Sequence, residues 1–157
     1  MKLELIDGCM ASSFTVDNKE VYKLSSEELL SYCTKVVNTI KNKDTLLNEF
    51  KECLTIIGDY DLSTDYYTIE LEETIKLVYL ESPYTREYKE YLTANDLNLE
   101  TYNINIIKKY FIQLLQKATE YQLYDCLRQL TEDIGIMKFL YHCDECGDNI
   151  YSYTIKL

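Results

Sequence analysis

Apolar residues that recur at steps of three and four positions constrain the middle of this chain most strongly, because that spacing places them on one face of an α-helix. The first such stripe spans residues 29–40 and follows Ser25, with Glu28 three positions after it. At that spacing the serine side chain accepts a hydrogen bond from the third helical N–H, and the glutamate reaches back to the capping residue. The sequence therefore predicts a capped amphipathic helix here.

Three further stripes of the same kind follow. One spans residues 46–57, where Asp44 is placed to cap the helix and Gly58 to end it. The other two span residues 104–118 and 123–134, and a glycine again follows the last stripe. Four amphipathic helices are therefore predicted.

Both ends of the chain alternate apolar and polar residues, as half-buried β-strands do. Residues 3–16 predict an antiparallel pair around Asp7-Gly8, and Asp17-Asn18 predicts a second turn. Residues 136–142 and 150–157 predict a C-terminal hairpin. If the two terminal hairpins join into one sheet, the helices are available to cover its apolar face.

The predicted fold is an α+β domain in which a helix-rich middle packs on a small antiparallel sheet built from the N- and C-terminal hairpins. A length of 157 residues fits a single globular domain, 1–157, and 46% hydrophobic residues suffice for a core. The sequence shows no low-complexity tract, internal repeat or linker rich in Pro and Gly.

The segment from Asp59 to Ser82 is compatible with either strand or helix. Tyr67 and Ile69 alternate as in a strand, but the length of the apolar pattern and the acidic pair Glu72-Glu73 favour a helix from about residue 66. Ser82-Pro83 then predicts the start of another helix, because Pro is tolerated at the first helical position. That second helix would carry Tyr84, Tyr88 and Tyr91 on one face.

The chain is strongly acidic, with 27 Asp and Glu against 16 Lys and Arg and a net charge of −11. Residues 59–82 contribute seven acids and one lysine, a net of −6, interleaved with tyrosines. Concentrated like charge destabilises the compact state, and a basic partner would offset it. We expect a partner-binding surface formed by Asp59, Asp61, Asp65, Tyr66, Tyr67, Glu70, Glu72, Glu73, Tyr79, Glu81, Tyr84 and Tyr88. The alternative is a solvated helix face with half-buried tyrosines.

The most specific chemical motif is the sequence His142-Cys143-Asp144-Glu145-Cys146-Gly147-Asp148. A C-x-x-C-G turn between strands lets both sulfurs face one cation, which predicts half of a structural zinc site. The candidate ligands are Cys143, Cys146, Cys9 and His142. A plain reduced thiol pair and a redox dithiol remain as alternatives. The other cysteines, Cys33, Cys53 and Cys126, lie at apolar helical positions and are expected in the core as reduced thiols.

The motif Asp7-Gly8-Cys9, the C-terminal Cys143-x-x-Cys146-Gly147-Asp148 and the final strand 153–157 together resemble small uncharacterised proteins of phages and mobile elements in AT-rich bacteria. The resemblance covers about 20 residues at the two ends of the chain. It implies a setting, the bacterial cytosol during phage or plasmid conflict, and it implies no reaction.

Catalysis is disfavoured by the composition. The chain contains one histidine and four glycines, and it has no phosphate-binding loop, dinucleotide fingerprint or nucleophile elbow. Its acidity argues against direct binding of nucleic acid, and it has no apolar run of roughly 18 residues that could span a membrane. A cytoplasmic location is expected.

The function predicted from the sequence is that of a non-enzymatic, acidic, protein-binding inhibitor. The expected partner is a basic protein, and the sharpest form of the hypothesis is nucleic-acid mimicry against a CRISPR effector or restriction enzyme. The alternatives are a zinc-stabilised interaction module and a thiol-based redox protein that uses Cys143 and Cys146.

Overall fold

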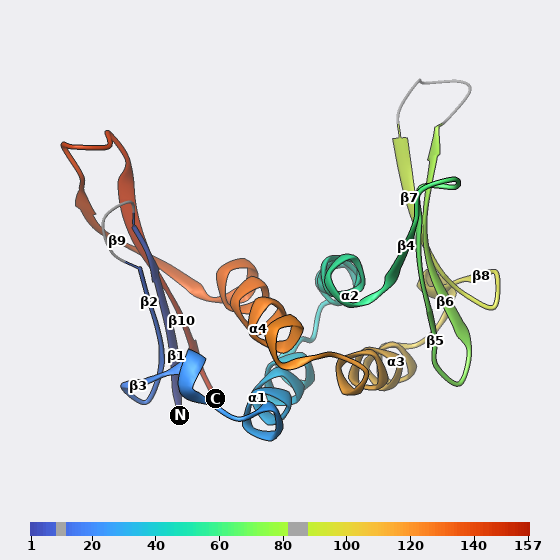
Figure 1. The fold of residues 1–157 in the computed structure, drawn as a ribbon, viewed down its shortest axis with the longest axis horizontal. Helices are drawn as coiled ribbons and strands as arrows, with labels where there is room; N and C mark the ends of the chain where they lie inside the picture. The colour runs from blue at the N-terminus through green and yellow to red at the C-terminus, as the bar shows by residue number, and fades with distance from the viewer. Residues whose placement is uncertain (9–11, 82–87) are drawn as a thin grey trace.

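The computed structural model describes residues 1–8, 12–81 and 88–157. Within them the protein is α+β, with four helices between two five-stranded antiparallel sheets (Figure 1). The four helices are α1 (Ser26–Thr39), α2 (Lys43–Ile57), α3 (Ile104–Gln116) and α4 (Glu120–Ile134). No helix in the described ranges is long and apolar enough to cross a membrane.

The first sheet, sheet A, joins the two ends of the chain. Its strands lie in the order β3 (Lys19–Glu20), β2 (Ser12–Val16), β1 (Lys2–Asp7), β10 (Asn149–Lys156) and β9 (Ile136–His142). The prediction that the terminal hairpins share one sheet is confirmed, since Leu3 pairs with Ile155 and Leu5 with Tyr153. The predicted turn at Asp17-Asn18 is also confirmed, because both residues have positive φ.

The second sheet, sheet B, was not predicted. Its strands lie in the order β4 (Asp59–Asp61), β5 (Tyr66–Glu70), β6 (Thr74–Glu81), β7 (Tyr88–Ala94) and β8 (Leu97–Asn98). The predicted helix from residue 66 is therefore wrong. Tyr67 and Ile69 pair with Leu77 and Ile75, which are buried, and this alternation of inward-facing residues prevails over the helical pattern.

The second predicted helix in this region is also wrong from Tyr88 onward, because residues 88–94 form strand β7. The alternating residues Leu92 and Ala94 are buried, as expected for one face of a strand. The expected start at Ser82-Pro83, together with Tyr84, lies outside the described residues.

Polar side chains begin each of the four helices. The predicted capping box at Ser25 and Glu28 is confirmed. In α2 the capping residue is Asn42, whose side chain accepts from the N–H of Thr45, so the prediction of Asp44 as the cap is wrong by two positions. Asp44 lies instead in the first turn, where its charge favours the helix dipole. Gly58 ends α2 as predicted.

The helices and the helix-facing sides of both sheets share one apolar core. The rings of Phe50 and Phe111 lie 5.1 Å apart within it. Cys33, Cys53 and Cys126 are buried there, which confirms the interpretation of these residues as core packing.

The chain contains an internal duplication, which corrects the expectation of no repeat. Three strands, a short 3-10 helix, two α-helices and two strands occur in that order twice, first from β1 to β5 and then from β6 to β10. The 3-10 helices are η1 (Val21–Lys23) and η2 (Leu99–Thr101). The repeat was missed because the halves share local geometry and burial much more than residue identity.

The corresponding turns show how closely the halves match. Lys2 N–H donates to Asp17 Oδ1 at 2.8 Å, and Thr74 N–H donates to Asn95 Oδ1 at 2.9 Å. The turn residues after each acceptor carry the same left-handed backbone, with φ of 66° at Asn18 and 68° at Asp96. Only residues that tolerate positive φ fit both sites.

The two halves exchange their last strands. β4 and β5 of the first half complete sheet B of the second, and β9 and β10 of the second half complete sheet A of the first. Gly58 and Gly135 lie where the chain leaves α2 and α4 for the exchanged strands. A Cβ atom at either position would lie within 2.7 Å of a carbonyl oxygen of the preceding helix, which explains glycine at both.

In sheet A the two chain ends lie side by side. They occupy the position that the link between β5 and β6, residues 71–73, occupies in sheet B. Leu157 N–H donates to the carbonyl of Met1 at 2.8 Å, and Leu71 N–H donates to that of Glu73 at 3.0 Å. In sheet B, β5 and β6 are therefore linked covalently through Glu72. Their counterparts in sheet A, β10 and β1, are linked at this end by hydrogen bonds between the termini.

This equivalence predicts that the chain can be circularly permuted. A variant that begins at Glu73, ends at Glu72 and joins Leu157 to Met1 through a single glycine should keep the native circular dichroism spectrum. Opening the junction weakens the exposed Glu72–Lys109 ion pair, which is worth about 0–1 kcal/mol. A control permutant opened between Leu77 and Val78, inside the central strand β6, should not fold. Equal loss of structure in both permutants would contradict the equivalence of the two junctions.

Candidate partner-binding face

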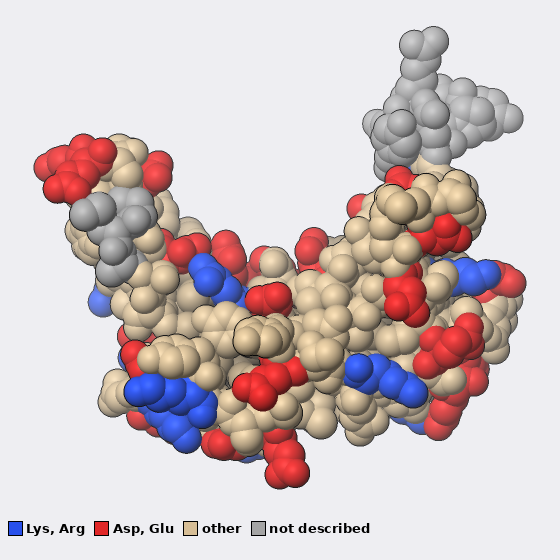
Figure 2. All heavy atoms as spheres, viewed as in Figure 1, with Lys and Arg blue, Asp and Glu red and all other residues tan. Residues whose placement is uncertain are grey.

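The molecule has a concave side between its two sheets. Both sheets extend beyond the helix layer, and α2 and α4 lie nearer to the open side than α1 and α3 (Figure 1). The space-filling view shows the resulting hollow, with the described atoms of the two arms rising on either side of it (Figure 2). We call the surface formed by α2, α4 and the helix-facing sides of the two sheets the concave face.

Four acids from three elements lie close together at this face. Glu49 and Glu52 come from α2, Asp133 from α4 and Glu90 from β7. Burial raises the pKa of Glu52, and the negative charges of Asp133 and Glu90 raise it further. None of the four forms an ion pair with a lysine or arginine of the described ranges. The cluster is therefore electrostatically unfavourable in the isolated protein.

Glu49 is the buried member of this cluster. Its side chain is 4% exposed, and its Oε2 atom has no hydrogen-bond partner among the described residues. Burial, then a side-chain hydrogen bond with Asp133 and the negative charge of that group, raise the pKa of Glu49 to about 9. At neutral pH this carboxyl holds its proton and keeps unused hydrogen-bonding capacity.

Aromatic side chains lie next to the acids on the helix-facing side of sheet B. Tyr60 and Tyr67 have ring centroids 4.9 Å apart, and those of Tyr67 and Tyr79 are 6.4 Å apart. Tyr67 pairs with the buried Leu77, so these rings stand on the helix-facing side of the sheet. Burial raises the pKa of Tyr79, and Glu90, Tyr67, Asp65 and Glu52 add to that shift.

Sheet A places a second aromatic group on its own helix-facing side. Tyr153 pairs with the buried Leu5, and Tyr151 lies two positions away on the same face. The rings of Phe139 and Tyr151 meet edge-on at 5.9 Å. The concave face therefore has an acidic floor between two aromatic walls.

The structure separates the partner-binding residues that the sequence predicted. Asp59, Asp61, Tyr66 and Glu70 occupy the outer face of sheet B, because they alternate with the inward-facing Tyr67. Of the predicted set, Tyr67 and Tyr79 are brought together at the concave face. Acidic side chains are spread over most of the visible surface instead of gathering on one part of it (Figure 2).

The remaining predicted residues have local roles or lie outside the described side chains. Glu72 binds Lys109 at 3.0 Å, and Glu73 accepts a hydrogen bond from Tyr110. Asp65 accepts the hydroxyl of Tyr60 in the turn before β5. Tyr84 lies outside the described residues, and of Glu81 and Tyr88 only the strand backbone is described.

The acids of the concave face were not predicted from the sequence. Glu49 did carry a signal, since it lies three positions after Leu46 and four before Cys53, on the apolar side of α2. A charged residue at such a position is buried only with a special reason. Glu52, Glu90 and Asp133 carried no such signal, because they come from α2, β7 and α4 and meet only in the tertiary structure.

The C-terminal hairpin turn closes as a tight loop. Gly147 has a φ of 77°, its N–H donates to the carbonyl of Cys143 at 2.8 Å, and Cys143 N–H donates to the carbonyl of Asp148 at 2.8 Å. His142 Nδ1 lies 2.8 Å from Asn149 Oδ1.

Cys146 is disulfide-bonded, which differs from the plain reduced thiol pair that the sequence left as one alternative for this turn. A disulfide sulfur is not the thiolate that zinc requires, so metal binding at this turn would need reduction first. Among the described residues no group of three or more His, Cys, Asp or Glu side chains is arranged to hold a metal ion. Cys9 lies outside them.

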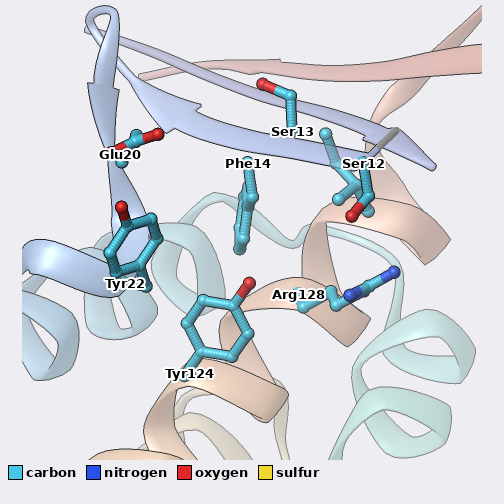
Figure 3. Close-up of a pocket in the computed structure, with 8 residues that line it drawn as sticks. Ser12, Ser13, Phe14, Glu20, Tyr22, Tyr124 and Arg128 are labelled. Carbon is cyan, nitrogen blue, oxygen red and sulfur yellow. The ribbon is translucent and has the colours of Figure 1, made fainter. Parts of the chain in front are cut away.

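A polar pocket of about 310 Å³ opens between β2 and α4 (Figure 3). Phe14 and Tyr124 meet edge-on in it at 5.9 Å, and Arg128 is ion-paired with Asp7 at 3.1 Å. The described part of the lining also contains Ser12, Ser13, Glu20 and Tyr22, and it includes no histidine or cysteine. These hydroxyl and charged groups can form hydrogen bonds with a ligand.

The buried thiols are not activated as nucleophiles. Burial raises the pKa of Cys33 well above its usual value. A hydrogen bond with Cys126, followed by burial, does the same for Cys53. Thiolates are therefore disfavoured at these two positions at neutral pH.

Comparison with protein-family models, with curated proteins and with solved structures finds no match for this chain.

Glu49 predicts a pH dependence of stability. Its pKa is about 9 in the folded protein and near the usual value of 4.5 in the unfolded chain. Between these values the folded state binds more protons, so the free energy of unfolding falls as pH rises. Glu49→Gln keeps the shape without the titration. Denaturant unfolding from pH 5 to pH 9 should show the free energy of unfolding of this variant rising relative to that of the wild type, by up to roughly 5 kcal/mol.

The matched control is Glu27→Gln, at an exposed position of α1. It should follow the wild type across the whole range. Parallel curves for the wild type and Glu49→Gln would show that Glu49 is ionised throughout and would refute the assignment.

Proposed function

We propose that this protein is a non-enzymatic, acidic, protein-binding inhibitor that receives a basic segment of its partner on the concave face. The observation that carries the proposal is the floor of that face, where Glu49 is buried without a partner for Oε2 beside Glu52 and Asp133. A cation and hydrogen-bond donors that reach these groups would stabilise them, so the free energy of the complex would be lower than that of the separate molecules.

The chemistry of the face matches Lys and Arg side chains. A guanidinium or ammonium group placed over the floor would lower the repulsion among Glu52, Glu90 and Asp133. The rings of Tyr60, Tyr67 and Tyr79 provide faces for cation–π contact, worth about 0.5–2 kcal/mol each depending on desolvation. Tyrosine also adds contact area at low entropic cost.

The target class that we propose is a nucleic-acid-handling protein, such as a CRISPR effector or a restriction enzyme, in the cytosol of a bacterial host. Such proteins present the basic grooves that a chain with a net charge of −11 would complement. A single acidic helix with phosphate-like spacing is not part of this proposal, because residues 66–81 form strands. The proposal rests on the concave face instead.

The test reverses charge on the floor. Glu52→Lys with Asp133→Lys should weaken inhibition of a target nuclease at least tenfold, because it replaces attraction by repulsion at the centre of the face. The control pair, Glu27→Lys with Glu70→Lys, makes the same change in net charge on exposed positions away from that face. DNA cleavage by a panel of restriction endonucleases and CRISPR effector nucleases, measured against inhibitor and salt concentration, gives the readout.

The expected pattern is inhibition of at least one nuclease that weakens with added salt, is kept by the control pair and is lost by the floor pair. Inhibition lost equally in both pairs would show that only net charge matters. Absence of inhibition across the panel would refute the target class.

The alternatives from the sequence remain distinct proposals: a structural zinc module and a thiol-based redox protein. The tight turn from Cys143 to Gly147 supports both, because it holds Cys143 and Cys146 in one loop. Metal analysis of the reduced protein, with and without chelator, tests the first. We expect substitution of Cys143 or Cys146 by Ser to leave nuclease inhibition unchanged; loss of inhibition would favour these alternatives.

A further inference from the structure

The edge of sheet A formed by β9 differs from the other sheet edges of the described chain. β9 ends sheet A and pairs on one side with β10. All seven of its residues are exposed, including Ile136 at 75%, Met137 at 59% and Phe139 at 53%. An exposed edge strand presents unpaired backbone N–H and C=O groups, and a long apolar one invites pairing with another chain.

The other three edges are short or charged. β3 and β8 contain two residues each, and β4 is the three-residue strand Asp59–Asp61. β4 is the counterpart of β9 in the duplication, since each follows the glycine that ends the preceding helix. The same edge is thus three residues long with two acids in one half. In the other half it is seven residues long, and five of them are apolar or aromatic beside Lys138 and His142. A common fold requirement does not explain that difference.

We propose that β9 binds an extended segment of a partner protein as a sixth strand of sheet A, and that this segment carries apolar residues flanked by Lys or Arg. Backbone hydrogen bonds along the edge provide affinity, and the alternating side chains of β9 provide specificity. This inference goes beyond the proposed function and does not rest on it, because it concerns strand pairing at the sheet edge. Asp133, which also belongs to the acidic floor, is one of five acids near the two ends of β9.

Charge identifies the occupant. Glu132 and Asp133 precede β9, and Asp144, Glu145 and Asp148 follow it, so both ends of the strand are acidic. A basic-flanked segment matches those ends. A second copy paired antiparallel about the middle of β9 would place the acids after one strand beside the acids before the other, which is unfavourable.

The test replaces two residues of β9 by the aspartates found at the corresponding positions of β4. Ile136→Asp with Lys138→Asp copies Asp59 and Asp61 onto the equivalent exposed positions, so the fold should be kept. The matched control, Leu97→Asp with Lys89→Asp, makes the same chemical changes on exposed positions of sheet B. Both variants and the wild type are screened with a random 12-residue peptide display library and examined by amide hydrogen exchange.

The proposal expects wild type and control to enrich peptides with apolar centres and basic ends, which protect the amides of β9 from exchange. The β9 variant should lose at least tenfold in affinity for those peptides while keeping its circular dichroism spectrum. The proposal is overturned if no peptide is enriched, if protection falls outside sheet A, or if the β9 variant binds as tightly as the control. It is also overturned if the wild type is a dimer that the β9 substitutions convert to a monomer, since the edge then belongs to a second copy.

Discussion

Exchange of strands between the two halves is the constraint on which the rest of the structure depends. Neither half can complete its own sheet, because its last two strands leave at Gly58 or Gly135 and pair with the other half. The pairing of β1 with β10 and of β5 with β6 therefore holds the halves together in addition to the shared core. The exchange also sets the two sheets apart with the helices between them, and so creates the concave face.

The local structure was predictable because it depends on neighbours in sequence. Ser25 with Glu28, Gly58 and the alternation around Leu3 and Phe14 each act within a few residues, and the structure agrees with them. Sheet B was not predictable, because Tyr67 and Ile69 carry a pattern that fits either structure. The strand forms because Tyr67 and Ile69 pair with Leu77 and Ile75 of the neighbouring strand β6, a contact that local sequence does not reveal.

The candidate site was less predictable than the fold. Its acids come from α2, α4 and β7, and no spacing in the sequence relates Glu52 to Asp133 or to Glu90. The acids that do cluster in sequence, such as Asp61 and Glu70, alternate outward on strands and are dispersed. Concentrated charge in a sequence thus locates a surface only when the secondary structure is known, because a strand sends adjacent residues to opposite faces.

Divergence between the two halves separates requirements of the fold from requirements of function. Both halves need glycine after the second helix and a left-handed turn residue before the 3-10 helix, and both have them. Glu49 in α2 corresponds in position to Cys126 in α4, and Asp59 corresponds to Ile136. A buried carboxyl costs stability, an exposed edge strand with five apolar or aromatic residues costs solubility, and each occurs in one half only. Since the same backbone does without them in the other half, the fold requires neither of them, and the proposed binding of a partner would account for both.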